Sequence, residues 1–387
     1  MSHPYWLSNP NKNKIKVDVA IIGSGISGLS MAYFLEKYSS KKILVLEKHS
    51  SGYGASGRNA GFISTGSLSL FQKMVESDGA AKAIEKRLFY KRNHDLLVSE
   101  FSKQKLESLC DYKNKGSMTI ALTKEKLDSI SQNLSELNLA GFNCSVQNIG
   151  EVYSSMKIAS KGGVLDSQDG EIHSKKLLDL IKSSLKTQVL ENQEVYQLNE
   201  NSLLSTDYEV EFSEVVIALN GYTELLLPEF KGVVRPIRGQ MMLLENKSQF
   251  LNHNAYVSEK LCYYRQLPDN SILIGGMRTL EEKTEVGFSD HYTTEKLQSA
   301  YEEFLKTNYP FLSSNKVSLR WAGIMGFTFD ESPLVGQLSP NRFYLGGYSG
   351  HGMGKAFACA EALASFMENQ TTIPEFINLS RVNLSKK

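Results

Sequence analysis

The feature that most constrains this chain of 387 residues is a run of glycines between two regular segments near its N-terminus. The sequence VDVAIIGSGISGLSMAYFLEKY places Gly23, Gly25 and Gly28 in the pattern G-x-G-x-x-G. Residues 17–22 are β-branched and apolar, which predicts a buried strand, and the apolar spacing over 26–38 predicts a helix. Glycines at such a junction allow a tight turn, close approach of a ligand to the backbone, and close packing of the helix on the strand.

An acidic residue follows at the place where a nucleotide-binding unit needs one. A second strand is predicted over 43–47 and ends in Glu47, 19 residues after Gly28. A carboxylate there can accept hydrogen bonds from a ribose, and the preceding helix N-terminus presents free N–H groups to phosphates. Strand, glycines, helix and acid together predict a bound dinucleotide. The alternative, in which the glycines serve only a tight turn, remains open.

Two further glycine-rich segments favour FAD over a nicotinamide dinucleotide. The run SSGYGASGRNAGFISTG (50–66) follows the acid directly and is expected to be an extended loop. The run GGYSGHGMG (346–354) precedes a predicted C-terminal helix. One loop would hold the pyrophosphate of a large cofactor. The other would set a helix N-terminus against a flavin ring, where the helix dipole favours the negative charge of the reduced flavin.

Composition excludes several classes of protein. The 43 basic and 42 acidic residues nearly balance, which argues against a nucleic-acid partner. Four scattered cysteines without a CxxC pair indicate reduced structural thiols and no metal site. No uninterrupted apolar run reaches the ~18 residues of a membrane span. Lysines before the first apolar run outline a signal peptide, but the glycines in that run favour a core strand, so we expect a cytoplasmic protein.

Strand–helix–strand patterns occur at both ends and in the middle of the chain, with β-rich patterns between them. They predict an α/β fold: a Rossmann-like FAD-binding domain built from separate segments, with an inserted antiparallel or mixed β-sheet substrate domain. We assign residues 1–75, 160–228 and 326–387 to the FAD-binding domain, and residues 76–159 and 229–325 to the substrate domain. Within these, residues 80–109 predict one long helix, and Ser174 is the expected N-cap of another.

Several blocks of sequence occur in a fixed order between about residues 17 and 366: DVAIIGSGISGLSMAYFL, GASGRNAGFI, VRPIRGQ, YYRQLPDNSILIGG, RWAGIMGFTFDESPLVG and FYLGGYSGHGMGKAF. These blocks and their order resemble the FAD-dependent D-amino-acid oxidase superfamily, in its glycine oxidase and sarcosine oxidase branch. The GASGRNAG run is most similar to the γ-glutamylputrescine oxidase-like members.

The resemblance implies which residues would contact FAD. Those at the pyrophosphate would be Gly23, Ser24, Gly25, Ile26, Ser27 and Gly28, with Glu47 and Lys48 at the adenosine ribose and the backbone of Val195 at the adenine. Those along the ribityl chain and flavin would be Ser56, Arg58, Asn59, Ala60 and Gly61, and those at the pyrimidine end Gly350, His351, Gly352, Met353 and Gly354.

Two departures from the family pattern bear on the site. Met325 stands where amino-acid-oxidising relatives often hold an arginine that clamps a substrate carboxylate, so simple α-amino acids are expected to be poor substrates. The alternative is that Arg278 or Arg265 reaches the same spot; the full set of candidate anchors is Arg235, Arg238, Arg265, Arg278 and Arg320. Sarcosine oxidase relatives attach flavin through a cysteine in this region. Residues 320–336 contain none, which implies noncovalent FAD.

Two residues are candidates for direct catalysis. His351 lies between glycines at a predicted helix start, although the loop could need only its backbone there. Tyr263 and Tyr264 are neighbours in a predicted strand, so one faces inward and one outward. We predict Tyr264 as the tyrosine that hydrogen-bonds the substrate, while a packed core tyrosine remains an equal alternative.

The sequence therefore predicts an FAD-dependent oxidoreductase that acts on a C–N bond of a small amine or amino acid. The α C–H of a neutral amine would be aimed at flavin N5, hydride transfer would give an imine, and electrons would pass to oxygen or another acceptor. One alternative is a dehydrogenase that uses a quinone or a carrier protein as acceptor. Another is a non-catalytic flavoprotein subunit.

Overall fold

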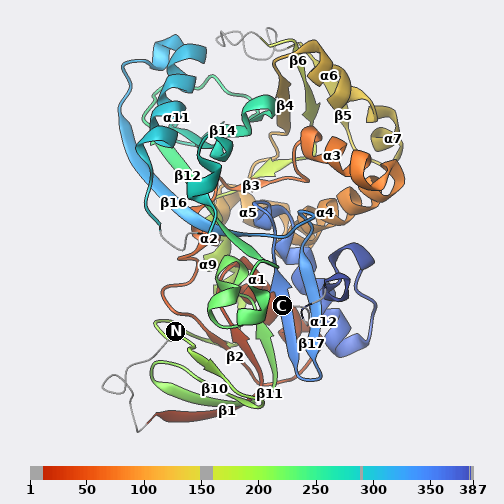
Figure 1. The fold of residues 1–387 in the computed structure, drawn as a ribbon, viewed down its shortest axis with the longest axis vertical. Coiled ribbons are helices and arrows are strands. Elements are labelled where there is room, and N and C mark those ends of the chain that lie inside the picture. Colours follow the sequence, from red (N-terminus) through yellow and green to blue (C-terminus); the bar gives the residue numbers. More distant parts are fainter. Residues whose placement is uncertain (1–11, 149–159, 288–290, 383, 385–387) are drawn as a thin grey trace.

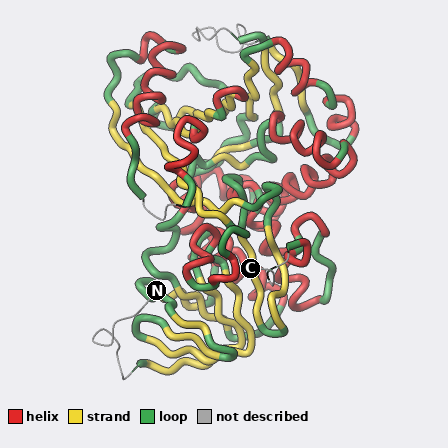
Figure 2. The backbone as a smooth tube through the Cα atoms, in the orientation of Figure 1, coloured by secondary structure: helices red, strands yellow, loops and turns green. Residues whose placement is uncertain are grey.

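The computed structural model describes residues 12–148, 160–287, 291–382 and 384 (Figure 1). The described residues form two eight-stranded sheets and a small two-stranded sheet. The two large sheets lie toward opposite ends of the long axis, with helices packed beside each (Figure 2). None of the helices in the described ranges is long and apolar enough to cross a membrane.

The first large sheet has a parallel centre, as predicted for a dinucleotide-binding unit. Its path is β17 (Leu334–Ser339), β18 (Arg342–Gly346), β11 (Tyr208–Ile217), β1 (Asn13–Ile22), β2 (Ile43–Leu46) and β8 (Gln188–Leu190). In addition, β10 (Ser202–Leu204) pairs with β11, and β9 (Gln197–Leu198) pairs with β10. All neighbours from β18 to β8 pair parallel. Segments far apart in sequence thus build one sheet.

Both faces of this sheet are covered. On one face Val19 and Ile21 of β1 lie in a core with α1 (Ile26–Tyr38), α9 (Ser174–Ser184) and α12 (Ala356–Asn369). On the other face Ala20 and Ile22 pack in a second core with residues of β10 and β11. Burial on both faces explains why the strand reads as a continuous apolar run rather than an alternating one.

The second large sheet is mixed. Its order is β16 (Val317–Phe327), β12 (Arg235–Leu244), β15 (Ile272–Gly276), β14 (Cys262–Gln266), β13 (Asn254–Val257), β4 (Ser117–Ala121), β6 (Gly162–Asp166) and β5 (Cys144–Gln147). Only β13 and β4 pair parallel. The predicted fold class, a Rossmann-like domain combined with an antiparallel or mixed sheet, is confirmed.

Successive side chains along these strands point alternately to two faces of the sheet, one buried in a core and the other facing the cavity described below. Met242, Tyr264 and Ile274 are fully buried in a core that includes Tyr301 of α11 (Glu295–Asn308). Their neighbours in sequence point to the opposite side of the sheet. That opposite side, the open face, looks toward the glycine turn of the first large sheet, residues 23–28 between β1 and α1.

Some expected elements differ in detail. The helix expected over 80–109 is two helices, α4 (Ala80–Phe101) and α5 (Lys103–Cys110). Ser102 breaks it with φ 57°, and its Oγ accepts a hydrogen bond from the N–H of Lys105 at 3.3 Å. Chain direction changes there although no glycine or proline marks the site, so the apolar spacing alone could not reveal the break.

The segment expected to be an extended loop contains short regular pieces. It includes α2 (Ala55–Arg58) and β3 (Phe62–Ile63), which pairs with β7 (Gly170–Glu171), and it leads into α3 (Leu68–Asp78). The N-cap of α9 is His173 rather than Ser174, because His173 Nδ1 accepts from the N–H of Lys176 at 3.4 Å.

Candidate active site

A cavity of about 250 Å³ lies where the glycine turn of the first large sheet meets the open face of the second. Its lining includes the turn 25–27, the segment 55–73, strands of the second sheet and the turns beside them, and the C-terminal loop 348–354, together with Ala218, Asn220 and Glu331. Residues separated by more than three hundred positions therefore face one space.

The glycines of the first turn are required by the backbone packing. Gly23 has φ +104°, and a Cβ there would lie 2.8 Å from the carbonyl oxygen of Ala218. A Cβ on Gly28 would lie 1.8 Å from the carbonyl oxygen of Gly23, so only glycine lets α1 approach the strand this closely. Gly25 differs, because it lines the cavity and a Cβ there would meet only the Oγ of Ser56, at 2.9 Å.

Glu47 stands beside this turn. Its carboxylate accepts hydrogen bonds from the N–H of Ser24 at 2.8 Å, from Ser24 Oγ at 3.1 Å and from the N–H of His49 at 3.0 Å. Lys48 turns away and forms a half-exposed ion pair with Glu194 at 2.9 Å. Val195 is half-buried beside the second core of the same sheet.

Helix α2 is held against the turn by its own side chains. Ser56 Oγ accepts from the N–H of Ile26 at 3.0 Å. Arg58 donates to the carbonyl oxygens of Tyr53 and Ala322 at 2.6 and 3.1 Å. Asn59 donates to the carbonyl oxygen of Ser56 at 2.7 Å and accepts from the N–H of Gly61, also at 2.7 Å. Ser56, Arg58, Asn59, Ala60 and Gly61 all line the cavity.

The C-terminal loop places His351 in the cavity wall as a neutral imidazole. Burial, followed by the charge of Lys355, lowers the pKa of His351 to about 3. Its Nδ1 lies 3.0 Å from the carbonyl oxygen of Ser349, so Nδ1 carries the proton and Nε2 keeps a free lone pair. Gly350, Gly352, Met353 and Gly354 line the same wall.

The open face of the second sheet supplies an aromatic and thioether wall. Tyr256 and Tyr263 are partners across β13 and β14, and both line the cavity together with Met241 and Met325. Tyr256 Oη lies 2.9 Å from Ser64 Oγ, and Tyr263 donates to Met241 Sδ at 3.4 Å. Burial raises the pKa of Tyr263 to about 12, so both phenols stay protonated at neutral pH.

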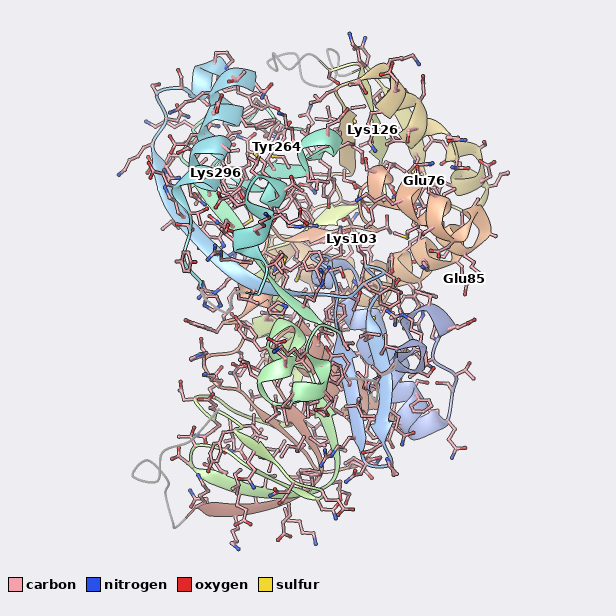
Figure 3. The ribbon with its side chains drawn as sticks, viewed as in Figure 1. Glu76, Glu85, Lys103, Lys126, Tyr264 and Lys296 are labelled. Carbon is pink, nitrogen blue, oxygen red and sulfur yellow. The ribbon has the colours of Figure 1, made fainter. Side chains whose placement is uncertain are left out.

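The prediction of Tyr264 as a catalytic residue is not supported by this geometry. Tyr264 lies on the core face beside α11, which carries the labelled Lys296 in Figure 3, and its Oη lies 2.9 Å from Tyr309 Oη. The alternation of the two tyrosines is as expected, but Tyr263 is the one that faces the cavity. Tyr256 also faces the cavity, but it is not among the residues predicted from the sequence. The alternation of side chains along β13 could have indicated it as the partner of Tyr263.

Four charged side chains line the cavity without an ion pair to any other described residue: Arg58, Lys73, Arg278 and Glu331. Of these, Arg58 is engaged by the carbonyl oxygens of Tyr53 and Ala322. The four candidate arginines other than Arg278 are engaged or distant from the cavity. Arg238 pairs with Glu285 at 2.7 Å, Arg265 with Glu171 at 3.2 Å and Arg320 with Glu302 at 2.6 Å, while Arg235 is exposed on β12.

A parallel sheet with a glycine turn, an acid at the end of its second strand and an adjoining cavity define a dinucleotide-binding protein. The chain belongs to the FAD dependent oxidoreductase family, whose model matches residues 18–366. It is thus an FAD-dependent oxidoreductase, and the residues present fit the cofactor because Gly25 leaves an open surface beside the N-terminus of α1.

Three relatives illustrate the likeness. The chain is 27% identical to the probable oxidoreductase OrdL of Haemophilus influenzae, covering 87% of this chain and 79% of that protein. It is 25% identical to gamma-glutamylputrescine oxidoreductase of Escherichia coli, over 90% of this chain and 85% of that protein. The crystal structure of glycine oxidase from Geobacillus kaustophilus has the same fold, with a TM-score of 0.78, 18% identity, and coverage of 96% and 99% of the two chains.

Proposed function

We propose that this enzyme oxidises a carbon–nitrogen bond of a small amine or amino acid. The observation that carries the proposal is that two different walls face one cavity. One is the dinucleotide-binding wall, and the other is an aromatic wall with few polar groups. Two relatives support it by name, since gamma-glutamylputrescine and glycine both carry the amine nitrogen that such a reaction needs.

FAD, when bound, would supply the redox chemistry by accepting a hydride from the substrate carbon. The chain's own residues would hold it in the order expected from the sequence. Gly23 to Gly28 would contact the pyrophosphate, Glu47 the ribose and Val195 the adenine. Lys48, whose side chain pairs with Glu194, would lie beside Glu47. The α2 segment and the loop 350–354 would face the flavin. The division into an FAD-binding domain and a substrate domain stays a proposal, and its boundary at residue 160 is drawn too early, because β6 (Gly162–Asp166) pairs with β4 and β5 in the second sheet.

The second sheet would position the substrate and exclude water. Tyr256, Tyr263, Met241 and Met325 present mostly apolar surface, which favours a neutral amine over an ammonium. His351 would accept a hydrogen bond at Nε2. Its pKa of about 3 makes it a weak base at neutral pH, so a positioning role fits better than proton abstraction.

The proposal predicts that an amine reduces the bound flavin without any other protein. The purified enzyme is mixed anaerobically with a panel of amines and amino acids, and loss of the oxidised flavin absorbance is followed. Loss with at least one member supports the proposal, and admission of air with assay of peroxide then separates an oxidase from a dehydrogenase. If dithionite bleaches the flavin and no amine does, the non-catalytic alternative is the better account.

A second prediction concerns attachment of the cofactor. All four cysteines are buried as free thiols, and burial raises the pKa of Cys262, the one that lines the cavity, so it is not a thiolate. We expect acid precipitation to release intact FAD into the supernatant. Yellow colour retained by the washed pellet would contradict noncovalent binding.

A further inference from the structure

We propose that Arg278 binds the carboxylate of the substrate, which makes the preferred substrate an amino acid rather than a simple amine. The inference rests on the proposed function. It also resolves the alternatives that Met325 left open, because the guanidinium comes from the 3-10 turn Arg278–Glu281 instead of from β16.

The backbone turns sharply where β15 ends, so that Arg278 enters the cavity. Gly276 has φ +99° and Met277 has φ 52°, two successive left-handed residues of which the second is not glycine. A non-glycine residue in this region is strained, and such strain persists where the surroundings require the conformation.

The guanidinium reaches the neighbourhood of Met325. Arg278 Cζ lies 4.8 Å from the ring centroid of Phe327, two residues along β16. Phe327 and Met325 both approach Gly350, where a Cβ would lie 3.6 Å from Phe327 Cζ and 3.7 Å from Met325 Sδ. Stacking on the ring fixes the plane of the guanidinium and leaves its N–H groups free to donate along that plane.

The charge of Arg278 acts on the residues proposed to surround the substrate. Burial raises the pKa of Tyr263, and the positive charge of Arg278 opposes that rise. Burial lowers the pKa of His351, and the charges of Lys355 and Arg278 lower it further. The guanidinium therefore lies within electrostatic reach of both the tyrosine wall and the C-terminal loop.

Among the five candidate arginines Arg278 alone lines the cavity without a carboxylate partner in the described part of the chain. A partly desolvated guanidinium without an anion is unfavourable, and a substrate carboxylate would supply the partner in a bidentate geometry. Two other cationic side chains line the cavity. Lys73 is exposed on α3, which suits it less to a fixed clamp, and Arg58 already donates to the carbonyl oxygens of Tyr53 and Ala322.

The test compares matched ligands that differ only in the carboxylate. Acetate and acetamide are titrated into the oxidised holoenzyme, and perturbation of the flavin spectrum or calorimetry gives their dissociation constants. Glycine and methylamine, and 4-aminobutanoate and butylamine, are compared by anaerobic flavin reduction. We expect the wild type to bind the carboxylates better.

Arg278→Met should weaken acetate binding and raise the concentration of amino acid needed for half-maximal reduction by about 100-fold. The member of each pair that lacks the carboxylate should change little. Arg235→Met, which removes an exposed arginine, is the matched control and should leave both members unchanged. Met325→Arg added to Arg278→Met should restore part of the carboxylate preference.

Two results would overturn the inference: an unchanged carboxylate preference in Arg278→Met, or an equal loss for the members of each pair with and without the carboxylate. The proposed function fails separately, if no amine or amino acid reduces the wild-type flavin. In that case the acetate and acetamide titrations still decide whether Arg278 is an anion-binding residue.

Discussion

Gly25→Val is expected to fold but to bind FAD at least about 100-fold more weakly than the wild type, a loss of ~2.7 kcal/mol or more. Gly25 lines the cavity at the N-terminus of α1, and the atom nearest to an added Cβ is Ser56 Oγ, a side-chain atom that can rotate away at the cost of its hydrogen bond from the N–H of Ile26. The branched side chain would therefore occupy the space of the pyrophosphate without colliding with the backbone. The flavin-to-protein ratio and the dissociation constant of FAD for the apoprotein measure this.

Gly28→Ala is the contrasting variant. Its Cβ would lie 1.8 Å from the backbone oxygen of Gly23, so the apoprotein itself should lose stability. Thermal unfolding of the two apoproteins separates a lost ligand contact from a damaged fold. Unchanged FAD affinity in Gly25→Val would show that this turn does not carry the phosphates.

The elements nearest the glycine turn could be predicted because their signals are local. β1, α1 and β2 follow from β-branched content, apolar spacing and three glycines within one short stretch. The fold class follows from the same kind of pattern repeated along the chain. No distant contact is needed to recognise any of them.

The choice between Tyr263 and Tyr264 could not be made in the same way. Period-two alternation establishes that they face opposite sides of the sheet. Which side is the core depends on α11, some thirty residues later, whose Tyr301 packs with Tyr264. The five arginines pose the same problem, since their ion-pair partners lie on other elements.

The part of the cavity wall formed by residues 64–73 is held by a buried ion pair that could not be predicted from any sequence pattern. Arg87 of α4 and Asp166 of β6 are fully buried and lie 2.9 Å apart, and Arg87 also donates to the carbonyl oxygen of Gly66 at 3.2 Å. Asp169 accepts from the N–H of Thr65 at 3.1 Å. The cluster therefore ties the start of the cavity wall to the second sheet.

Arg87→Met should lower the free energy of unfolding by about 3–5 kcal/mol, because it leaves a buried carboxylate without its cation. Arg320→Met is the matched control. Its pair with Glu302 is about one third exposed on each side, so its loss should cost under ~1 kcal/mol. Chemical denaturation of the two variants at pH 8 checks both values, and equal losses would show that burial does not set the cost.

The loss of unfolding free energy in Arg87→Met should also depend on pH. The carboxyl groups near Arg87 determine whether the loss is larger at high or at low pH. Burial and the charge of Asp166 raise the pKa of Asp169 to about 7, and Arg87 opposes the rise. Without Arg87 that pKa would rise further above its unfolded value. Stability linked to a raised carboxyl pKa is present at low pH and is lost as pH increases through the folded-state value. The destabilisation measured at pH 8 should therefore exceed that at pH 5.5, and a loss independent of pH would indicate that Arg87 acts by packing on Phe71 and Phe142 rather than by charge.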